Sequence, residues 1–506
     1  MRPLWAREPG RRRAQGGPVS TCLGGAGAAA EHGLRRRPVS LRKWDGARAG
    51  AGARRLRWQG DGVSDTRRLC AALLPLTALV AALALTFTTG GTLGHPGPLA
   101  LWYPVDLVLF AVAVWALRRL PARQVSALVL AGAVAAAAVA LVAAPRTSDD
   151  AYRYLWDGQV QAAGHSPYAY PPDAPQLAGL RARAPELYPV TGSCTGWDLR
   201  RAAPGFCSHV NRPAVVTIYP AVAEYWFLGL HLVAHGHGVR AAQAGGALLA
   251  VALTALLLAV LAPRRRWQAA LWGWFPGVAV WAVNDAHVDT LGALLAVAGL
   301  TLTARGRGWW GGAVLGAAAA VKLLPALVLP GAAARGRGPG WSVRVLLAAA
   351  GVFLLSYLPY LLLSGPKVLG FLPGYLHDEG YEGAQPRRFA LLRLVLPDSL
   401  AALAAGVVVV AVALLVLRTG DPARPWDGAL LVSGTALLAL TPAYPWYGLL
   451  VVALVGLAGR WEWLAVPAAG EAAYLTQGGA QLAGYAVALA VVAGAAAVRH
   501  RRGRRA

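Results

Sequence analysis

Acidic side chains gather at the start of a long polar segment, residues 145–212, which follows an apolar run. Asp150, Arg153 and Asp157 are spaced three and four residues apart, so on a helix they share one face. Asp149 stands where it can cap that helix. A carboxylate at this place, next to a membrane span, is suited to act as a general base. The alternative is an interfacial helix with a cap and solvated charges.

Further polar residues stand among apolar ones. The motif NDAHVD places Asn284, Asp285, His287 and Asp289 between two apolar runs, and Lys322 stands within AAAAVKLLPALVLP. An ionisable group at membrane depth costs about 2.5–3.5 kcal/mol on insertion scales and usually has a partner or a function. These residues suit the phosphate and sugar of a lipid-linked donor, or the ions of a coupled transporter. For Lys322 the alternative is a side chain that extends to the lipid headgroups.

Two later motifs combine arginines with aromatic residues. Arg387 and Arg388, in GYEGAQPRRFALLR, can hold a phosphate as bidentate donors. Tyr444, Trp446 and Tyr447, in TPAYPWYGLLVV, can stack on a sugar ring. Trp and Tyr are also enriched at membrane interfaces without any ligand, which is the alternative interpretation of the second motif.

Two of the four cysteines, Cys194 and Cys207, lie in the polar segment 145–212. If this segment is extracytoplasmic, a disulfide between them is expected to stabilise the loop by roughly 3 kcal/mol. The alternative is two unpaired thiols. Neither residue has the companion His or Cys spacing of a zinc site.

The composition shows which elements must position these residues. Of 506 residues, 57% are apolar and only 14% are charged, with a mean hydropathy of +0.47, which is typical of a polytopic membrane protein. The longest apolar-poor stretch between apolar runs, 145–212, has 68 residues, which excludes a separate nucleotide-binding domain of ordinary size there. We predict twelve to fourteen transmembrane helices within 69–498. The apolar runs are 70–89, 100–118, 124–144, 214–233, 241–262, 268–283, 287–303, 309–333, 342–363, 398–417, 427–440, 444–459, 461–475 and 479–498.

The distribution of charge predicts the orientation. The net charge is +25, and basic residues concentrate in the amino-terminal arm, in the tail and in short connectors. By the positive-inside rule these parts are cytoplasmic: 1–68, 118–123, 418–424 and 499–506. The loops 145–212, 364–397 and 441–445 are then outside, and we expect a multi-pass plasma-membrane protein with an extracytoplasmic active site. The basic connector 263–267 conflicts with this count.

The arm 1–68 is rich in Arg, Gly and Ala and lacks periodicity, so we expect it to be disordered. No apolar core follows within the first 30 residues, which argues against an ordinary signal peptide. A start near Val63 is an alternative to Met1. A basic arm can bind nucleic acid, but beside membrane spans its charge favours cytoplasmic retention, so we predict no nucleic-acid partner.

Several motifs occur in one order along residues 145–450: SDDxYRYLWDGxV, GxSPYAY, HVNRP with TIYP, NxHVD, VKLLPALVLP, RRFALLR and PAYPWY. Together they resemble the polyprenyl-phosphate-mannose-dependent mannosyltransferases of glycosyltransferase family 87 and their actinobacterial relatives in the GT-C superfamily. The resemblance implies an all-α GT-C fold with a large first external loop that carries the catalytic base. The family's Asn-Pro-Tyr is Ser166-Pro167-Tyr168 here, and its Tyr-Pro-Pro is Tyr219-Pro220-Ala221.

The resemblance implies a mechanism. Asp149, with Asp150 beside it, is expected to deprotonate an acceptor hydroxyl that attacks the anomeric carbon with inversion. Lys322, Arg387 and Arg388 are expected to stabilise the departing phosphate. The expected substrate-binding residues are Arg153, Asp157, Tyr168, Asn284, Asp285, His287, Tyr444, Trp446 and Tyr447.

The expected partners are a polyprenyl-phosphate sugar donor, a lipid-linked or glycan acceptor, and membrane lipids. We predict no cofactor and no metal, because positive side chains make a divalent ion unnecessary for the phosphate. Two alternatives stay open: a transferase for another polyprenyl-linked sugar, such as arabinose or glucose, and a lipid-sugar transporter or flippase. Transporters typically have paired halves with broken helices in matching positions, and no such symmetry is evident in the sequence.

Overall fold

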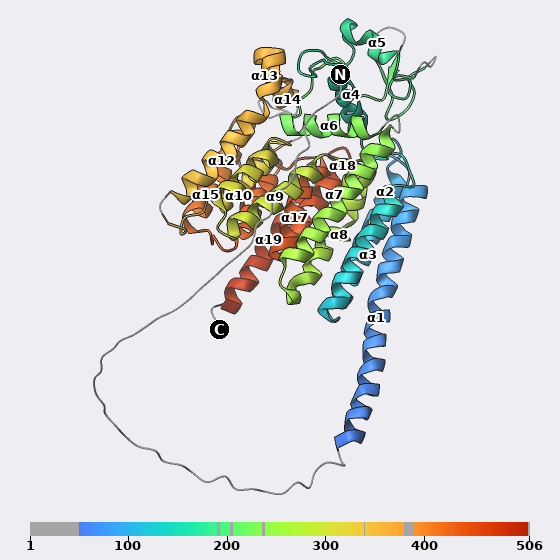
Figure 1. Ribbon diagram of the computed structural model, residues 1–506, viewed down its shortest axis with the longest axis vertical. Helices are drawn as coiled ribbons and strands as arrows, with labels where there is room; N and C mark the ends of the chain where they lie inside the picture. The colour runs from blue at the N-terminus through green and yellow to red at the C-terminus, as the bar shows by residue number, and fades with distance from the viewer. Residues whose placement is uncertain are drawn as a thin grey trace, which may run out of the picture. The chain divides into compact units, whose positions relative to one another are not determined.

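Long apolar helices make up most of the chain in the computed structural model (Figure 1), which describes residues 50–189, 193–202, 206–234, 238–338, 340–378 and 388–503. Residues 61–506 form one compact unit. In this described part the secondary structure is helical apart from one short β-hairpin and an isolated bridge. The prediction of an all-α polytopic membrane protein is therefore confirmed.

Three long helices begin the described chain: α1 (Gly50–Thr89), α2 (Gly97–Leu117) and α3 (Ala122–Ala140). The boundary expected after residue 68 thus lies inside a helix, while the first 49 residues of the predicted arm lie outside the described residues. Figure 1 shows α1, α2 and α3 running side by side away from the end of the molecule that carries α4, α6, α13 and α14.

The polar segment after α3 folds into short elements. They are α4 (Asp150–Ala162), η1 (Pro175–Leu177), α5 (Ala178–Arg181), β1 (Arg200–Arg201) and β2 (Cys207–Ser208). The two strands pair antiparallel, with Arg201 opposite Cys207. A disulfide joins Cys194 to Cys207, whose Cα atoms are 5.4 Å apart. The structure therefore has the disulfide and not two unpaired thiols. The disulfide closes a ring of chain that includes strand β1.

The middle of the chain contains a sharply bent helix pair. Its elements are α6 (Ala221–Ala234), α7 (Val239–Val260), η2 (Pro263–Ala269), α8 (Ala270–Gly273), η3 (Val278–Asn284), α9 (Asp289–Ala304), α10 (Gly308–Ala319), η4 (Leu324–Val328) and α11 (Leu329–Ala332). The π-helix η3 and helix α9 meet at 110°. The NDAHVD motif forms the bend, so its polar side chains lie where the helical hydrogen bonding is interrupted.

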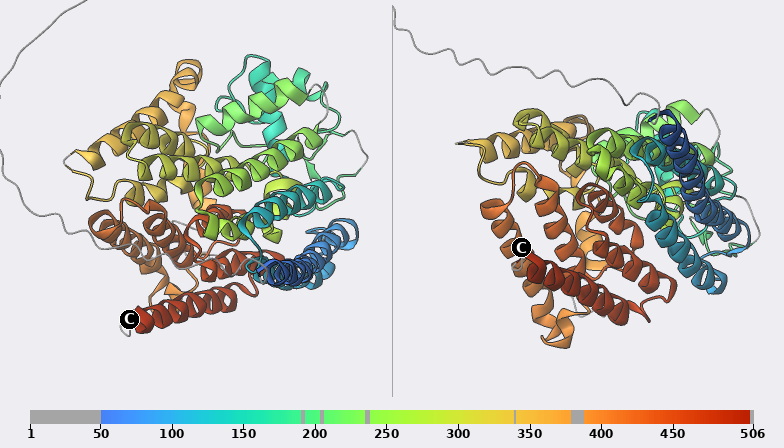
Figure 2. Two further views of the ribbon diagram at one scale, coloured as in Figure 1. Left: turned by 60° about the horizontal axis from the view of Figure 1, so that its bottom comes forward. Right: turned by 90° about the horizontal axis from the view of Figure 1, so that it is seen from below.

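The remaining elements are α12 (Trp341–Ser356), α13 (Leu358–Ser364), η5 (Gly365–Leu369), α14 (Leu372–Asp378), η6 (Leu392–Leu394), α15 (Asp398–Thr419), α16 (Pro425–Leu440), η7 (Pro445–Gly448), α17 (Leu449–Ala458), η8 (Trp461–Leu464), α18 (Ala465–Leu475) and α19 (Gln481–Gly503). In Figure 2 the blue helices α1 and α2 lie at one side of the molecule, and the orange to red helices α15 to α19 lie at another.

Seven described segments are long and apolar enough to cross a membrane, or eight if η3 and α9 count as one span. This number is below the twelve to fourteen predicted from the apolar runs. The difference arises because several runs form helices too short to cross a bilayer alone. All ten residues of α17 are buried, as expected for a helix that is apolar on every side. Such runs fill the interior of the bundle.

Candidate active site

Asp149 and Asp150 lie at the junction between the loop after α3 and the first turn of α4. The side-chain amide of Asn211 donates to both, at 3.1 Å to Asp149 Oδ1 and 2.6 Å to Asp150 Oδ1. The Arg200 guanidinium pairs with the other oxygen of Asp149. The Tyr219 hydroxyl donates to Asp150 Oδ2 over 3.3 Å. One amide therefore bridges the two adjacent carboxylates, and each carboxylate has a further partner of its own, Arg200 for Asp149 and Tyr219 for Asp150.

The Asp149 side chain does not cap α4, although the residue occupies the N-cap position. Its carboxylate points instead to Asn211 and Arg200. The alternative of an interfacial helix with a capping Asp149 is therefore wrong for this residue. Burial raises the pKa of the Asp149 carboxyl, the positive charge of Arg200 opposes this rise, and the negative charge of Asp150 adds to it. A raised pKa makes the carboxylate a stronger base.

Asp285 holds the loop that carries these two acids. Its Oδ1 accepts the backbone N–H groups of Arg146, Thr147 and Ser148 at 3.2, 3.1 and 3.3 Å. Its Oδ2 accepts the Thr147 hydroxyl. The side chain is fully buried. With both oxygens occupied by this loop, the carboxylate is a positioning group for Asp149.

Asn284 fixes the other side of the same loop. Its side-chain amide donates to three carbonyl oxygens at the end of α3, those of Ala140, Ala143 and Ala144, at 3.0, 3.1 and 3.2 Å. Its Oδ1 accepts the backbone N–H of Arg146 at 3.1 Å. Because these groups would otherwise be orphaned where the helix ends, Asn284 satisfies them inside the protein. A direct contact between Asn284 or Asp285 and substrate stays a prediction.

His287 is the residue of NDAHVD that faces the acids. Its Nδ1 lies 3.5 Å from Asp150 Oδ2, and its ring stacks on Trp446 with a centroid distance of 4.0 Å. Both ring nitrogens are buried and have no hydrogen-bond partner among the described residues. The preceding Ala286 has a φ of 55°, in the left-handed region that L residues rarely adopt. The strained bend thus places a buried imidazole beside Asp150.

Lys322 has an acidic partner inside the protein. Its Nζ lies 2.7 Å from Asp289 Oδ2, and 4.7 Å from the centre of the Tyr447 ring. The Lys322 side chain is 18% exposed. Lys322 is therefore held by Asp289 inside the protein and does not simply extend to the lipid headgroups. Tyr447 packs against Trp446, whose ring stacks on His287, so the ion pair and the imidazole border the same aromatic segment.

The PAYPWY segment covers His287 and Lys322 with aromatic rings. Tyr444 and Trp446 stack at a centroid distance of 5.0 Å, and Trp446 also packs against Tyr474 at 5.3 Å. The Tyr474 hydroxyl donates to the Thr147 carbonyl at 2.5 Å. Trp446 is only 5% exposed, so little of its ring is open to a sugar. Tyr444 and the half-buried Tyr447 are better placed for that contact.

Arg153 and Asp157 form an ion pair within α4. Arg153 Nε lies 3.0 Å from both Asp157 oxygens, and Arg153 Nη1 donates to the Val215 carbonyl at 3.2 Å. Both residues are buried, and they lie on one face of α4, as their spacing predicts. These contacts anchor α4 to the chain before α6. Their predicted role in substrate binding is untested, and the contacts present are internal.

Tyr168 is also engaged inside the protein. Its hydroxyl donates to the Tyr219 carbonyl at 2.7 Å, and its ring packs edge-on against Tyr360 at 5.2 Å. Because Tyr219 in turn donates to Asp150, Tyr168 supports the site through a neighbour. Its predicted contact with substrate remains a prediction.

Arg388 is almost fully buried, whereas Arg387 lies outside the described residues. The chain after Arg388 is attached to the end of α16: the Phe389 N–H donates to the Leu440 carbonyl at 3.1 Å, and the Ala390 N–H donates to Thr441 Oγ1 at 2.9 Å. Arg388 is therefore close in the fold to the beginning of the aromatic segment.

Five contributors to the site have no assigned role in the sequence: Arg200, Asn211, Tyr219, Asp289 and Tyr474. Asn211, Tyr219 and Asp289 belong to the HVNRP, TIYP and NxHVD motifs, so these motifs were the available signal. Arg200 and Tyr474 carry no such signal, because their contacts depend on the tertiary fold. The residues that the structure describes include no group of three His, Cys, Asp or Glu side chains that could hold a metal ion.

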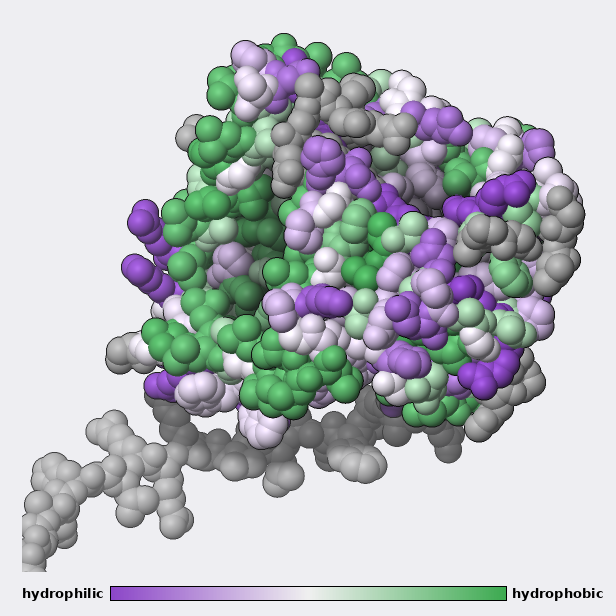
Figure 3. All heavy atoms as spheres, turned by 90° about the horizontal axis from the view of Figure 1, so that it is seen from above, coloured by the Kyte–Doolittle hydropathy of each residue, from purple (hydrophilic) through white to green (hydrophobic). Residues whose placement is uncertain are grey.

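Figure 3 looks onto the end of the molecule that carries α4 and α6. Hydrophilic side chains gather on one part of this face, and hydrophobic ones surround a hollow on the other.

Residues 217–442 match the model of glycosyltransferase family 87. This match makes the chain a glycosyltransferase. The matched segment includes Tyr219, His287, Asp289 and Lys322, while Asp149 precedes it. No curated protein and no solved structure matches the chain. The predicted enzyme class is confirmed, and the multi-pass helices place this glycosyltransferase in a membrane.

Replacing Asp285 with alanine is expected to destabilise the glycosyltransferase and to slow transfer. The change removes the acceptor for three backbone N–H groups and one hydroxyl, and we expect a loss of about 3 kcal/mol in the free energy of unfolding. Thermal unfolding in detergent and the transfer rate measure the two effects. The matched control is Asp398→Ala, an exposed acid paired with Arg393, where we expect a loss below about 1 kcal/mol. Equal unfolding temperatures for the two variants would contradict the positioning role.

Proposed function

We propose that this glycosyltransferase transfers a sugar, mannose in α-linkage, from a polyprenyl-phosphate donor to a lipid-linked or cell-envelope glycan acceptor. The site is proposed to face the extracytoplasmic side of the plasma membrane. The observation that carries the proposal is the bridged pair Asp149–Asp150, with His287 Nδ1 3.5 Å from Asp150 and the Lys322–Asp289 ion pair beside the same aromatic segment as His287. A base at one end and a cation at the other suit a displacement at a sugar carbon between them.

Asp149 is the proposed general base. Its carboxylate accepts the proton of the acceptor hydroxyl, and the acceptor oxygen forms a bond to the anomeric carbon. The bond from that carbon to the donor phosphate breaks, and the phosphate leaves with the electron pair. The configuration at the anomeric carbon inverts, so a β-linked donor gives an α-linked product. Asp150 supports this role because it shares the Asn211 amide with Asp149.

Lys322 is proposed to bind the donor phosphate before the reaction and to stay in contact with it as it leaves. A charge-assisted contact in a partly dry site is worth more than the same contact in water. Asp289 keeps the ammonium in place before the donor binds. Arg388 is the second candidate for this role, on the evidence that its segment is attached next to the aromatic residues.

The test is a transfer assay with the purified enzyme and a panel of radiolabelled polyprenyl-phosphate sugars that includes mannose, arabinose and glucose. The expected result is a covalently labelled lipid or glycan from the mannose donor. If the enzyme transfers only arabinose or glucose, the proposed sugar is wrong and the proposed class of donor still holds. Transfer from a nucleotide sugar alone would overturn the proposal.

Asp149→Asn is expected to reduce the turnover number by about 10²–10⁴, the usual contribution of acid–base catalysis. Asparagine keeps the size of the side chain and an oxygen for the Asn211 amide, so folding and donor binding should be retained. Initial rates at saturating donor measure the effect. The comparison with Asp150→Asn assigns the base, and Asp398→Asn is the surface control. A fully active Asp149→Asn enzyme would move the base to another group.

Arg200→Ala is expected to shift the acid side of the pH–rate profile to higher pH. The carboxylate is the working form of a base, so activity falls as the pH drops through the pKa of Asp149. Removing the opposing positive charge raises that pKa further. The profile of kcat/KM against pH measures the shift, and Arg201→Ala, next along the same strand, controls for the loss of one surface charge. A shift to lower pH, or the same shift in the control, would count against Asp149 as the base.

Lys322→Ala is expected to weaken donor binding more than it slows the chemical step. The lost contact to the phosphate already exists in the ground state, so KM for the donor should rise by about 10- to 100-fold. Asp289→Asn keeps the ammonium and is the matched control for breaking the ion pair. An unchanged donor KM in the Lys322 variant would assign the phosphate to another cation.

A further inference from the structure

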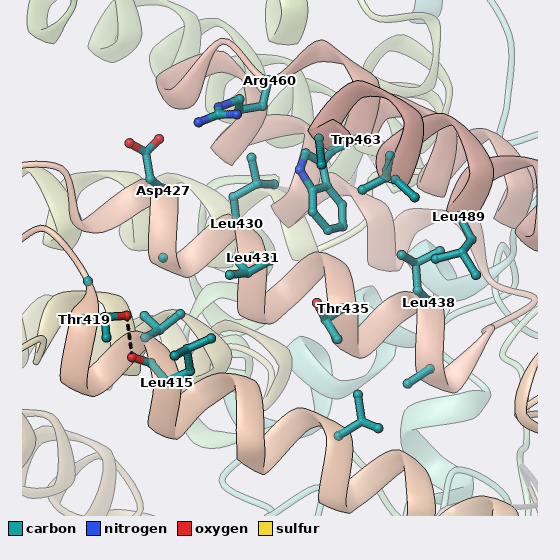
Figure 4. A pocket seen from close by; sticks show the side chains of 18 of the residues that line it. Leu415, Thr419, Asp427, Leu430, Leu431, Thr435, Leu438, Arg460, Trp463 and Leu489 are labelled. Atoms are coloured by element: carbon teal, nitrogen blue, oxygen red, sulfur yellow. Dashed lines mark hydrogen bonds between the residues drawn. The ribbon is translucent and has the colours of Figure 1, made fainter. Parts of the chain in front are cut away.

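Two of the cavities in the described part of the protein differ in their lining. The larger one, of about 710 Å³, lies between α15, α16 and α19 and is lined mainly by aliphatic side chains (Figure 4). The smaller one, of about 340 Å³, lies where α10 and α12 begin. It is lined by two glycines, three tryptophans and two arginines, among them Trp309, Trp310, Trp341, Arg307 and Arg344. We call this second one the basic cavity.

The basic cavity lies at the opposite end of α9 from the candidate active site. Helix α9 begins at Asp289, the partner of Lys322, and its sixteen residues extend over about 24 Å to Ala304. The next three residues end at Arg307, which lines the cavity. With the active site outside, as proposed above, the basic cavity is on the cytoplasmic side. Its arginines agree with the positive-inside rule.

The Trp341 ring forms a fixed floor of the cavity. A Cβ atom at Gly308 would lie 2.8 Å from this ring, so the ring packs directly on the backbone of that glycine. The Trp341 indole N–H donates to the Ala332 carbonyl at 3.1 Å. The Arg337 guanidinium lies 5.3 Å from the centre of the Trp341 ring and donates to the Pro422 carbonyl at 2.8 Å. These contacts hold the cavity open without a ligand.

The two arginines that line the cavity have no acidic partner among the described residues. No Asp or Glu occurs between Asp289 and Asp378 in the sequence, whereas five arginines lie within 305–344. The ion pairs of the described residues include neither Arg307 nor Arg344. Both side chains are exposed. An anion that enters the cavity therefore meets two guanidinium groups, each of which can donate two parallel hydrogen bonds to a phosphate.

An apolar surface continues from the cavity along α12. Leu347, Leu354 and Leu355 follow Arg344 by three, ten and eleven residues, so they lie on the same side of the helix. All three leucines are exposed, in a segment that is apolar and long enough to cross a membrane. The exposed rings of Trp309 and Trp310 lie at the cavity, as expected at a membrane interface. The order of charge, aromatic rings and apolar surface matches a molecule with an anionic headgroup and acyl chains.

We propose that the basic cavity binds the phosphate of an anionic phospholipid in the cytoplasmic leaflet. Arg307 and Arg344 hold the phosphate oxygens, and the acyl chains lie along the exposed leucines of α12. Basic pockets between transmembrane helices on the cytoplasmic side are a general form of site for anionic lipids. A zwitterionic headgroup fits less well, because its ammonium group would lie among arginines. This site goes beyond the proposed function and does not depend on the identity of the sugar donor.

The experiment measures lipid binding to the purified full-length protein in a neutral detergent. The probes are phosphatidylglycerol, phosphatidylcholine with the same acyl chains, and inorganic phosphate alone. Native mass spectrometry counts the bound lipids and gives their affinity, and thermal unfolding measures stabilisation. The variants are Arg307→Gln with Arg344→Gln, and Arg307→Lys with Arg344→Lys. The matched control is Arg264→Gln, an exposed arginine of η2 that does not line the cavity.

We expect phosphatidylglycerol to bind the wild-type protein and to raise its unfolding temperature, whereas phosphatidylcholine does neither. The double glutamine variant should bind phosphatidylglycerol about 10- to 100-fold more weakly, because it loses the charge-assisted hydrogen bonds. The double lysine variant keeps the charge but loses the forked geometry, so its affinity should be intermediate. Without lipid, all variants should unfold at the wild-type temperature, since the changed side chains are exposed, and this shows that they are folded.

Equal binding of phosphatidylglycerol by the wild-type protein and the double glutamine variant would overturn the proposal. Equal binding of the two lipids by the wild-type protein would overturn it as well. A loss in the Arg264 control as large as in the cavity variant, or wild-type affinity in the double lysine variant, would show only a general attraction to basic surface. Stabilisation by inorganic phosphate alone, to the same extent as by phosphatidylglycerol, would make the ligand a soluble phosphate and not a lipid.

Discussion

The candidate active site of this glycosyltransferase depends on the bend between η3 and α9, which holds the loop 145–149 after α3. Asn284 and Asp285 supply the oxygen atoms and the amide that saturate the end of α3 and the three residues before Asp149. These groups are buried, so water cannot replace the partners, and a free N–H or carbonyl there would be costly. The position of the proposed base is therefore determined by the bend between η3 and α9.

The same bend determines the electrostatic pattern. Within a few residues it supplies the loop anchor Asp285, the imidazole of His287 and the acid Asp289. Negative and positive groups then alternate across the site: Arg200 beside Asp149, and Lys322 beside Asp289. Alternation lets several ionisable groups share a dry environment, because each charge is compensated locally. The arrangement keeps the proposed base and the proposed phosphate ligand apart, with His287 between them.

Much of this could be predicted from sequence, but unevenly. Composition was sufficient for a helical membrane protein, and helical spacing predicted that Arg153 and Asp157 share a face, as they do. The order of the motifs indicated that Asp150, His287 and Lys322 belong to one site. The number of spans was less predictable, because an apolar run can form either a membrane span or a short buried helix. The run of α17 forms a short buried helix. Which residues of NDAHVD anchor the loop and which one faces the acids depends on tertiary contacts that no local pattern specifies. The same holds for the bridging of two acids by Asn211.

The ring closed by Cys194 and Cys207 has a consequence for how the site matures. Arg200 lies inside that ring, on the strand that pairs with Cys207, so the covalent closure limits where its guanidinium can be. A newly made chain whose thiols are still reduced has a larger set of positions for Arg200, and so a weaker hold on Asp149. The disulfide thus restricts the guanidinium whose positive charge opposes the rise in the pKa of Asp149.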